Sequence, residues 1–131
     1  MSITLNLPMS KKLSLHNMVS KAELDQFVGS ETFYEQLMVD GSKLLLTEGC
    51  HFIREMYSAY WLFDLIGSYQ YKLLEEPIQV WKLVKFKDEA QITCEDGNGN
   101  ILVNQEIPFT DFPFDITIWQ IEGTCLLPSE Y

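Results

Sequence analysis

Apolar positions along the chain change their spacing near residue 77, from a helical period to the alternation typical of strands. Between residues 20 and 76, apolar side chains recur three or four positions apart, which is the spacing of one helix face. Ser20 and Glu23 match a capping box and predict a short helix over 21–28. A second helix is predicted to follow, with its cap and apolar face at Ser30, Phe33, Tyr34, Leu37 and Met38.

The middle of the chain combines one ambiguous segment with a strong helical pattern. Residues 44–46 are three leucines, too short a run to distinguish a strand from a helix. Thr47 fits an N-cap and predicts that a helix begins after it. From Ala59 to Leu74 the apolar residues recur at helical spacing on several sides, so we expect this helix to lie at the centre of the core.

After Pro77 the residues favour strands joined by tight turns. Residues 89–95 alternate, with Ala90, Ile92 and Cys94 on the inward side, and residues 96–100 contain the Asp, Gly and Asn typical of a hairpin turn. Further strands are predicted over 78–87, 101–107, 116–121 and 124–127.

No helical stretch separates these strands, so we expect an α+β fold in which N-terminal helices pack on one face of a C-terminal antiparallel β-meander of 3–5 strands. The predicted organisation is one domain over 1–131, with an arm (1–19), a helical half (20–76) and a β half (77–131).

Composition indicates a folded protein that keeps its thiols reduced. A hydrophobic content of 47% is too high for a disordered chain. The three cysteines are scattered and form no CxxC pair, so we expect reduced, buried thiols, and whether Cys94 and Cys125 lie close together is left open. Neither a secretory signal nor an apolar run long enough for a membrane span is present, so the predicted location is cytoplasmic, with no membrane partner.

The charge is unevenly distributed along the chain. The net charge is −10, and residues 88–131 contain nine acidic residues but no Lys or Arg. This arrangement predicts a negative field on one side of the molecule, which disfavours direct binding to nucleic acid and favours a basic protein surface as the partner. The carboxylates predicted to bind that partner are Glu89, Glu95, Asp96, Glu106, Asp111, Asp115 and Glu122.

The sequence gives weak signals for catalysis or metal binding. Residues 96–100 begin like an EF-hand loop, but the required Gly and Glu are missing further on, so a hairpin turn is favoured. His51 and Glu55 are four apart on a predicted helix and favour a surface pair. Asp64 is the one acidic residue of the most apolar helix, and an exposed position is favoured over a buried one. We therefore predict no catalytic residue, no metal site and no cofactor.

Several short motifs occur in order along the chain and carry a family resemblance. They are F-V-G-S-E (27–31), A-Y-W-L (59–62), E-D-G-N-G-N (95–100), F-T-D-F-P (109–113) and L-P-S-E-Y (127–131). From about Phe27 to the C-terminus the chain resembles a family of small uncharacterised bacterial proteins, found in cyanobacteria and on plasmids and phages. The resemblance implies a mobile-element setting, and it assigns no activity and no catalytic residue.

Three functional hypotheses follow. The leading one is a small acidic protein-binding module, in one form an anti-CRISPR-like inhibitor of a host nucleic-acid-processing defence complex, whose surface carboxylates imitate phosphates. The first alternative is a small metal-dependent hydrolase or nuclease that uses Asp64, Asp111, Asp115 or His51 with a divalent ion. The second alternative is a self-associating structural module, which would form a homodimer.

Overall fold

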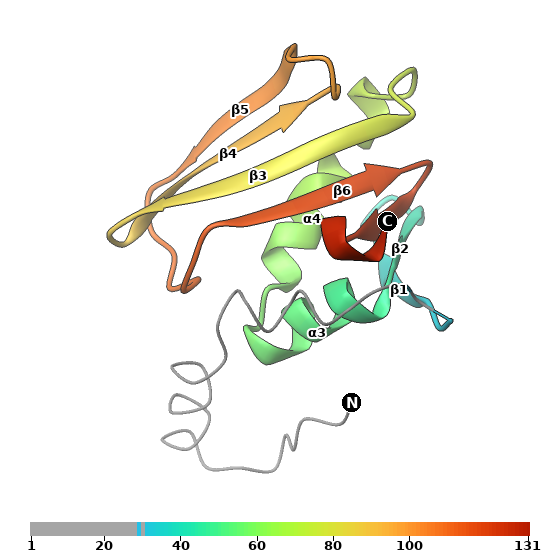
Figure 1. Ribbon diagram of the computed structural model, residues 1–131, viewed down its shortest axis with the longest axis horizontal. Helices are drawn as coiled ribbons and strands as arrows, with labels where there is room; N and C mark the ends of the chain where they lie inside the picture. Colours follow the sequence, from blue (N-terminus) through green and yellow to red (C-terminus); the bar gives the residue numbers. More distant parts are fainter. Residues whose placement is uncertain (1–28, 30) are drawn as a thin grey trace.

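A seven-stranded mixed sheet dominates this computed structural model, which describes residue 29 and residues 31–131 (Figure 1). The strands run in the order β1-β2-β7-β6-β3-β4-β5. The pair β2 and β7 is parallel, and every other neighbouring pair is antiparallel. The strand bounds are β1 (Tyr34–Leu37), β2 (Lys43–Leu46), β3 (Ile78–Phe86), β4 (Glu89–Glu95), β5 (Ile101–Ile107), β6 (Ile116–Ile121) and β7 (Thr124–Leu126).

Two short α-helices pack on one face of the sheet, and no α-helix of the described residues covers the other face (Figure 1). They are α3 (Glu48–Met56) and α4 (Tyr60–Ser68), and two 3-10 turns, η1 (Gln70–Lys72) and η2 (Pro128–Glu130), complete the described part of the chain. The predicted N-cap is confirmed, because the Oγ1 of Thr47 accepts a hydrogen bond from the backbone N–H of Cys50 at 3.4 Å. Between the helices and the sheet lies the core, with Phe63, Ile66, Ile92 and Ile118 at its centre.

The prediction of N-terminal helices on a simple antiparallel meander is wrong. In the described residues the two α-helices lie in the middle of the chain, and the segment predicted to form a helix from Ser30 contains strand β1 instead. This strand buries the polar Gln36, which is 6% exposed, and turns the apolar Leu37 to solvent, at 70% exposed. The apolar residues whose spacing predicted a helix in this segment are therefore not the residues that the strand buries. The predicted arm (1–19) and the first helix (21–28) lie outside the described residues.

The sheet is mixed because the ambiguous leucine run forms strand β2, which pairs in parallel with β7 near the C-terminus. A local sequence pattern cannot predict this pairing, because the two strands are far apart in the sequence. The helix predicted over 59–74 is shorter than expected: α4 ends at Ser68, and Gln70–Lys72 continues as the tighter turn η1.

The remaining strand predictions agree closely with the structure. Strands β4, β5 and β6 have the predicted bounds, and Ala90, Ile92 and Cys94 point into the core, each at most 6% exposed. The β4–β5 turn is built as its composition predicts, because Asp96 Oδ1 accepts hydrogen bonds from the backbone N–H groups of Asn98 and Asn100. Cys94 on β4 and Cys125 on β7 are three strand spacings apart in the sheet order, about 14 Å, which is too far for a disulfide.

Candidate functional site

Strand β3 carries apolar side chains on both of its faces. The residues that alternate with its core-facing Gln79, Trp81 and Leu83 point away from the helices. Four of these five outward residues are apolar, namely Ile78, Val80, Val84 and Phe86, and the fifth is Lys82. Phe86 is 68%, Val84 51% and Ile78 44% exposed. The outward face of an antiparallel sheet is ordinarily polar where it meets water, so this strand departs from the usual pattern.

The neighbouring strand β6 widens this apolar surface at its Ile78 end, and Lys82 with its partner Thr117 separates that part from Val84 and Phe86. The outward residues of β6 include Trp119, which pairs with Val80, and Ile121, which pairs with Ile78. The C-terminal Tyr131 packs edge-on against Trp119, with the ring centroids 5.1 Å apart. We call the set formed by Ile78, Val80, Val84, Phe86, Trp119 and Ile121 the outer stripe.

Three of the seven carboxylates predicted to bind a partner lie on this outward face. Glu89 and Glu95 alternate with the buried residues of β4, and Glu106 pairs with the outward Gln91 from strand β5. Glu95 is ion-paired with Lys82, at 2.7 Å between Oε2 and Nζ. Glu89 and Glu106 remain exposed to solvent beside the outer stripe.

The other four predicted carboxylates lie at the ends of the sheet. Asp96 is in the β4–β5 turn, where the hydrogen bond from the Asn100 side chain lowers its pKa. Glu122 is in the β6–β7 turn. Asp111 and Asp115 are in the loop between β5 and β6, and Asp115 Oδ1 accepts the backbone N–H of Lys85 at 2.7 Å. The structure therefore does not bring all seven together on a single surface.

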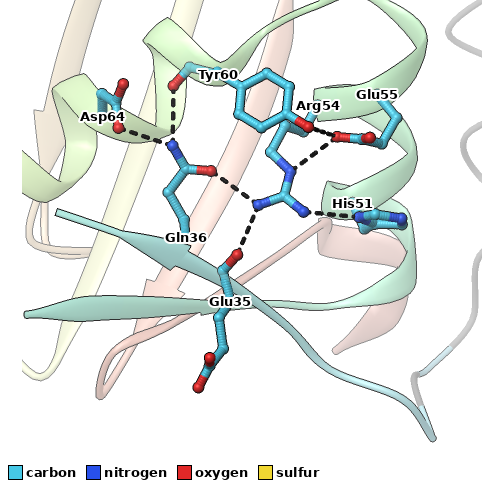
Figure 2. Close-up of polar contacts among 7 residues, drawn as sticks. All are labelled: Glu35, Gln36, His51, Arg54, Glu55, Tyr60 and Asp64. Atoms are coloured by element: carbon cyan, nitrogen blue, oxygen red, sulfur yellow. Dashed lines mark hydrogen bonds and ion pairs between the residues drawn. The ribbon is translucent and has the colours of Figure 1, made fainter.

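Two of the residues that the sequence offered for metal chemistry, His51 and Asp64, lie in a polar network around a buried arginine (Figure 2). Arg54 on α3 is 7% exposed, and its Nη1 donates to Gln36 Oε1 and to the backbone carbonyl of Glu35, both at 2.8 Å. Its Nε lies 3.2 Å from Glu55 Oε2, and its guanidinium lies 5.0 Å from the ring centroid of Tyr60. We call Glu35, Gln36, His51, Arg54, Glu55, Tyr60 and Asp64 the arginine cluster.

His51 is held as a neutral imidazole within the arginine cluster. Its Nδ1 lies 3.0 Å from Nη2 of Arg54, and because a guanidinium can only donate, Nδ1 must be the acceptor. Burial and the neighbouring Arg54 charge lower the pKa of His51. The ring stacks on Tyr34, with the centroids 3.6 Å apart. His51 and Glu55 thus do not bind each other as a simple pair, because Arg54 contacts both of them.

Asp64 is exposed, as favoured from the sequence, and its Oδ1 accepts a hydrogen bond from Gln36 Nε2 at 2.8 Å. In the part of the chain that the structure describes, no three His, Cys, Asp or Glu side chains come together as metal ligands. Asp64, Asp111, Asp115 and His51 therefore do not assemble the metal centre that the hydrolase alternative requires.

Sequence reasoning missed two polar roles that the fold depends on. Gln36 and Arg54 gave no signal, because their partners come from different elements. Glu130 in the C-terminal motif is buried, and it accepts hydrogen bonds from Thr47 Oγ1 (2.6 Å), Gly49 N (3.1 Å) and Leu127 N (2.9 Å). A carboxylate at the first turn of α3 also suits the positive end of the helix dipole. The C-terminal motif thus anchors the end of the chain to α3.

Comparison with known protein families identifies the family of this chain. The profile of a family of unknown function, DUF6876, matches residues 18–131. The chain belongs to the DUF6876 family. This agrees with the resemblance to an uncharacterised family. A search of curated proteins and a search of solved structures found no match for this DUF6876 protein. Within its described residues, no helix has both the length and the apolar character needed to cross a membrane.

Proposed function

We propose that this DUF6876 protein is a binding protein that docks its outer stripe on a partner protein with a complementary apolar patch surrounded by basic groups. The observation that carries the proposal is strand β3, whose outward positions are mostly apolar and exposed although they face away from the core. Apolar side chains grouped on an exposed face are typical of interaction surfaces.

The energetics of docking favour the Phe86 end of the outer stripe. Large aromatic side chains contribute most of the binding energy at protein interfaces when a pocket on the partner removes them from water. Phe86 is the most exposed member of the stripe, so it has the most to gain from being covered. Val84 lies two residues away on the same face and extends the contact along the strand.

The charges favour a basic partner over a second copy of the chain. Glu89 and Glu106 are exposed beside the outer stripe, and the positive charge of Lys82 is matched by Glu95. The exposed Lys87, whose Nζ lies 5.8 Å from the ring centroid of Phe86, offsets one of the two free carboxylates and leaves a net negative charge there. A symmetric dimer through this face would bring the same carboxylates of two chains, each of net charge −10, towards one another. A partner with Lys or Arg around its apolar patch would be attracted at long range and would bind faster at low salt.

The proposal does not extend to phosphate mimicry in a defence complex. Only three of the seven candidate carboxylates share the outward face, and they do not form a continuous line of free negative charge. The mobile-element setting implied by the resemblance is compatible with many kinds of partner, and it stays a prediction about where relatives occur.

A capture experiment with matched variants tests the proposal. The full-length chain is used as bait in three forms, the native sequence, Val84→Ser with Phe86→Ser, and Leu37→Ser as a control at an equally exposed apolar residue of β1. We expect the native bait and the control bait to capture the same partner protein, and the double variant to fail to capture it. Less of this protein should be captured in high salt or by a Glu106→Lys bait. Retention of the same protein by the double variant would refute the proposal. Loss of a homodimer in that variant by light scattering would favour the self-association alternative.

A further inference from the structure

Strand β5 is the last strand in the sheet order, so only one of its two edges is paired, with β4 (Figure 1). The two-residue turn at 87–88 makes Phe86 and Glu89 a hydrogen-bonded pair, which fixes the alternation of backbone groups along β4. Every second residue of β4 from Glu89 onwards therefore bonds to β3, and the residues between them bond to β5. In the β4–β5 register, the backbone N–H and C=O groups of Asn104 and Glu106 then point to the free edge.

The opposite edge of the sheet, strand β1, is shorter and partly closed. Leu45 N–H donates to the Gly123 carbonyl at 2.9 Å, so Leu45 faces β7 and its partner Glu35 faces the free edge of β1. There the Glu35 carbonyl accepts the 2.8 Å hydrogen bond from Arg54. β1 has four residues, whereas β5 has seven and contains neither the Lys nor the Pro that commonly protect an edge. The bulge against β4 lies at the Ile101 end and leaves the rest of β5 in regular pairing.

An open groove of about 650 Å³ lies beside the first half of β5, on the helix side of the sheet. One wall is β5, at Leu102, Val103 and Asn104, and the other is the segment that contains η1. On that second wall Leu74 is 84% and Tyr71 69% exposed, so apolar surface faces water. A strand added to β5 would point every second side chain into this groove. A free edge beside an apolar groove is the arrangement with which domains bind extended peptides.

The two walls of the groove are held together by the protein itself. The Tyr69 hydroxyl next to η1 donates to Gln105 Oε1 of β5 at 2.5 Å, and the Tyr69 ring packs on Trp81 with the centroids 5.9 Å apart. Leu73, also in this segment, is 6% exposed and belongs to the core. A groove that is formed before binding loses less conformational entropy when a ligand enters it.

The charges around the groove favour a basic segment as the occupant. Its lining contains two carboxylates, Glu75 and Glu76, and one cation, Lys72. The Nζ of Lys72 lies 5.5 Å from the ring centroid of Tyr71, and β5 itself adds the negative charge of Glu106. A second copy of this chain is disfavoured, because pairing of two β5 strands would bring together two chains of net charge −10.

We propose that the free edge of β5 pairs with an extended, basic segment of a partner protein, whose alternate apolar side chains fill the groove. Backbone hydrogen bonds to Asn104 and Glu106 supply affinity, and the wall formed by Tyr71 and Leu74 selects apolar side chains. The site lies at the sheet edge and on its helix side, whereas the outer stripe lies on the opposite face. The inference therefore does not require the outer stripe to bind anything.

The test is an NMR titration of the full-length protein with the capped peptide acetyl-KVTVKV-amide, which alternates polar and apolar residues and carries two positive charges. The reporters are the backbone N–H groups of Asn104 and Glu106. In the free protein these N–H groups should exchange rapidly with solvent, and in the complex they should shift saturably and become protected. The charge-inverted peptide acetyl-EVTVEV-amide should bind at least about fivefold more weakly.

Two N-methylated forms of the basic peptide separate strand pairing from contact of side chains alone. One form is methylated at the three valines and the other at the remaining three residues. The N–H groups of successive residues in a strand point to opposite sides, so only one form loses the donors that face β5. We expect that form to bind roughly tenfold or more weakly and the other to bind like the unmodified peptide.

Variants of the protein test the edge and the groove separately. Asn104→Pro removes an N–H from the free edge without removing a bond to β4, a position where proline is tolerated, and should weaken binding roughly tenfold. Leu74→Ser, at a fully accessible side chain that leaves the core untouched, should weaken binding roughly threefold or more. Leu37→Ser on β1 is the matched control at an exposed leucine and should bind like the native protein.

Absence of saturable shifts, equal binding of the two N-methylated peptides, or unchanged binding in both Asn104→Pro and Leu74→Ser would overturn the proposal. Protection of the Asn104 and Glu106 N–H groups in the free protein would also overturn it, because the edge would then already be paired, and a dimer in light scattering would identify a second copy as the occupant. Val84→Ser with Phe86→Ser should leave peptide binding intact, so this site and the docking proposal fail independently.

Discussion

Replacing Arg54 should destabilise the protein mainly because its buried hydrogen-bond acceptors would lose their donor, and less because the positive charge is lost. Arg54→Met keeps an apolar stem in place but removes the donors to Gln36 Oε1 and the Glu35 carbonyl, both bonded at 2.8 Å. Gln36 is 6% exposed, and a buried acceptor without a partner costs about 1–3 kcal/mol. The Glu35 carbonyl loses its donor too, and the relief of a buried cation offsets part of the two costs together, so we expect a loss of about 2–3 kcal/mol in unfolding free energy.

A double-mutant cycle shows whether the two side chains act as a unit. Gln36→Leu alone should cost about 1–2 kcal/mol, because it leaves an Arg54 N–H without its acceptor. The double variant Gln36→Leu with Arg54→Met should cost about 1–2 kcal/mol less than the sum of the single variants, since neither buried group is then left unpaired.

Urea denaturation followed by circular dichroism gives these free energies, provided that the m-value stays constant. Lys43→Met is the control. Lys43 on β2 is ion-paired with Glu35 on β1, and both side chains are about half exposed, so loss of this ion pair should cost less than about 0.5 kcal/mol. Strictly additive single variants, or an Arg54→Met cost no larger than that of the control, would refute the buried-network reasoning.

Three further predictions concern other parts of the described structure. Because burial and Arg54 hold the pKa of His51 below its ordinary value of 6.5, the unfolded chain binds the proton first as pH falls. Stability should therefore decrease as pH drops below about 6.5, and a His51→Gln variant should lose this part of the pH dependence in urea titrations between pH 7.5 and 5. Gly49→Ala should destabilise the fold by about 1–3 kcal/mol in the same assay, because its Cβ would lie 2.6 Å from Glu130 Oε1 and displace that carboxylate from three donors; an unchanged midpoint would contradict this contact. A thiol reagent such as Ellman's should label no cysteine of the native protein and three after unfolding, because burial raises the pKa of all three buried thiols; fast native labelling would contradict this for Cys50, Cys94 and Cys125.

The strands of the C-terminal half could be predicted because each has a local pattern that agrees with its burial. In β4 the alternation of Ala90, Ile92 and Cys94 with polar residues matches the two faces of the sheet, and the following Asp-Gly-Asn turn fits only a tight connection. The N-terminal half could not be predicted in this way. Strand β1 buries the polar Gln36, which accepts a hydrogen bond from Arg54, and exposes the apolar Leu37. The polar and apolar residues of this strand are therefore placed contrary to the usual rule of burial.

The candidate sites depended on relationships that a local pattern does not contain. Counting carboxylates after residue 87 found a real excess of charge, but turn residues such as Asp96 and Glu122 lie at an end of the sheet, away from the face that carries Glu89. The apolar outward positions of β3 were present in the sequence. They became visible as a surface only when the register with β6 placed Trp119 beside Val80 and the helices covered the opposite face. The groove beside β5 combines residues of η1 with residues of β5, and no spacing links them.

Photo-crosslinking in cells tests the central claim most directly. A photoreactive residue placed at Val84, near the Phe86 end of the outer stripe, should yield a crosslinked species with a different protein whose contact surface is basic, and the same residue placed at Leu37 on β1 should not. The yield from Val84 should fall when Glu106→Lys is added. Crosslinks that appear equally at both positions, or that join only two copies of this chain at Val84, would contradict docking of the outer stripe on a basic partner.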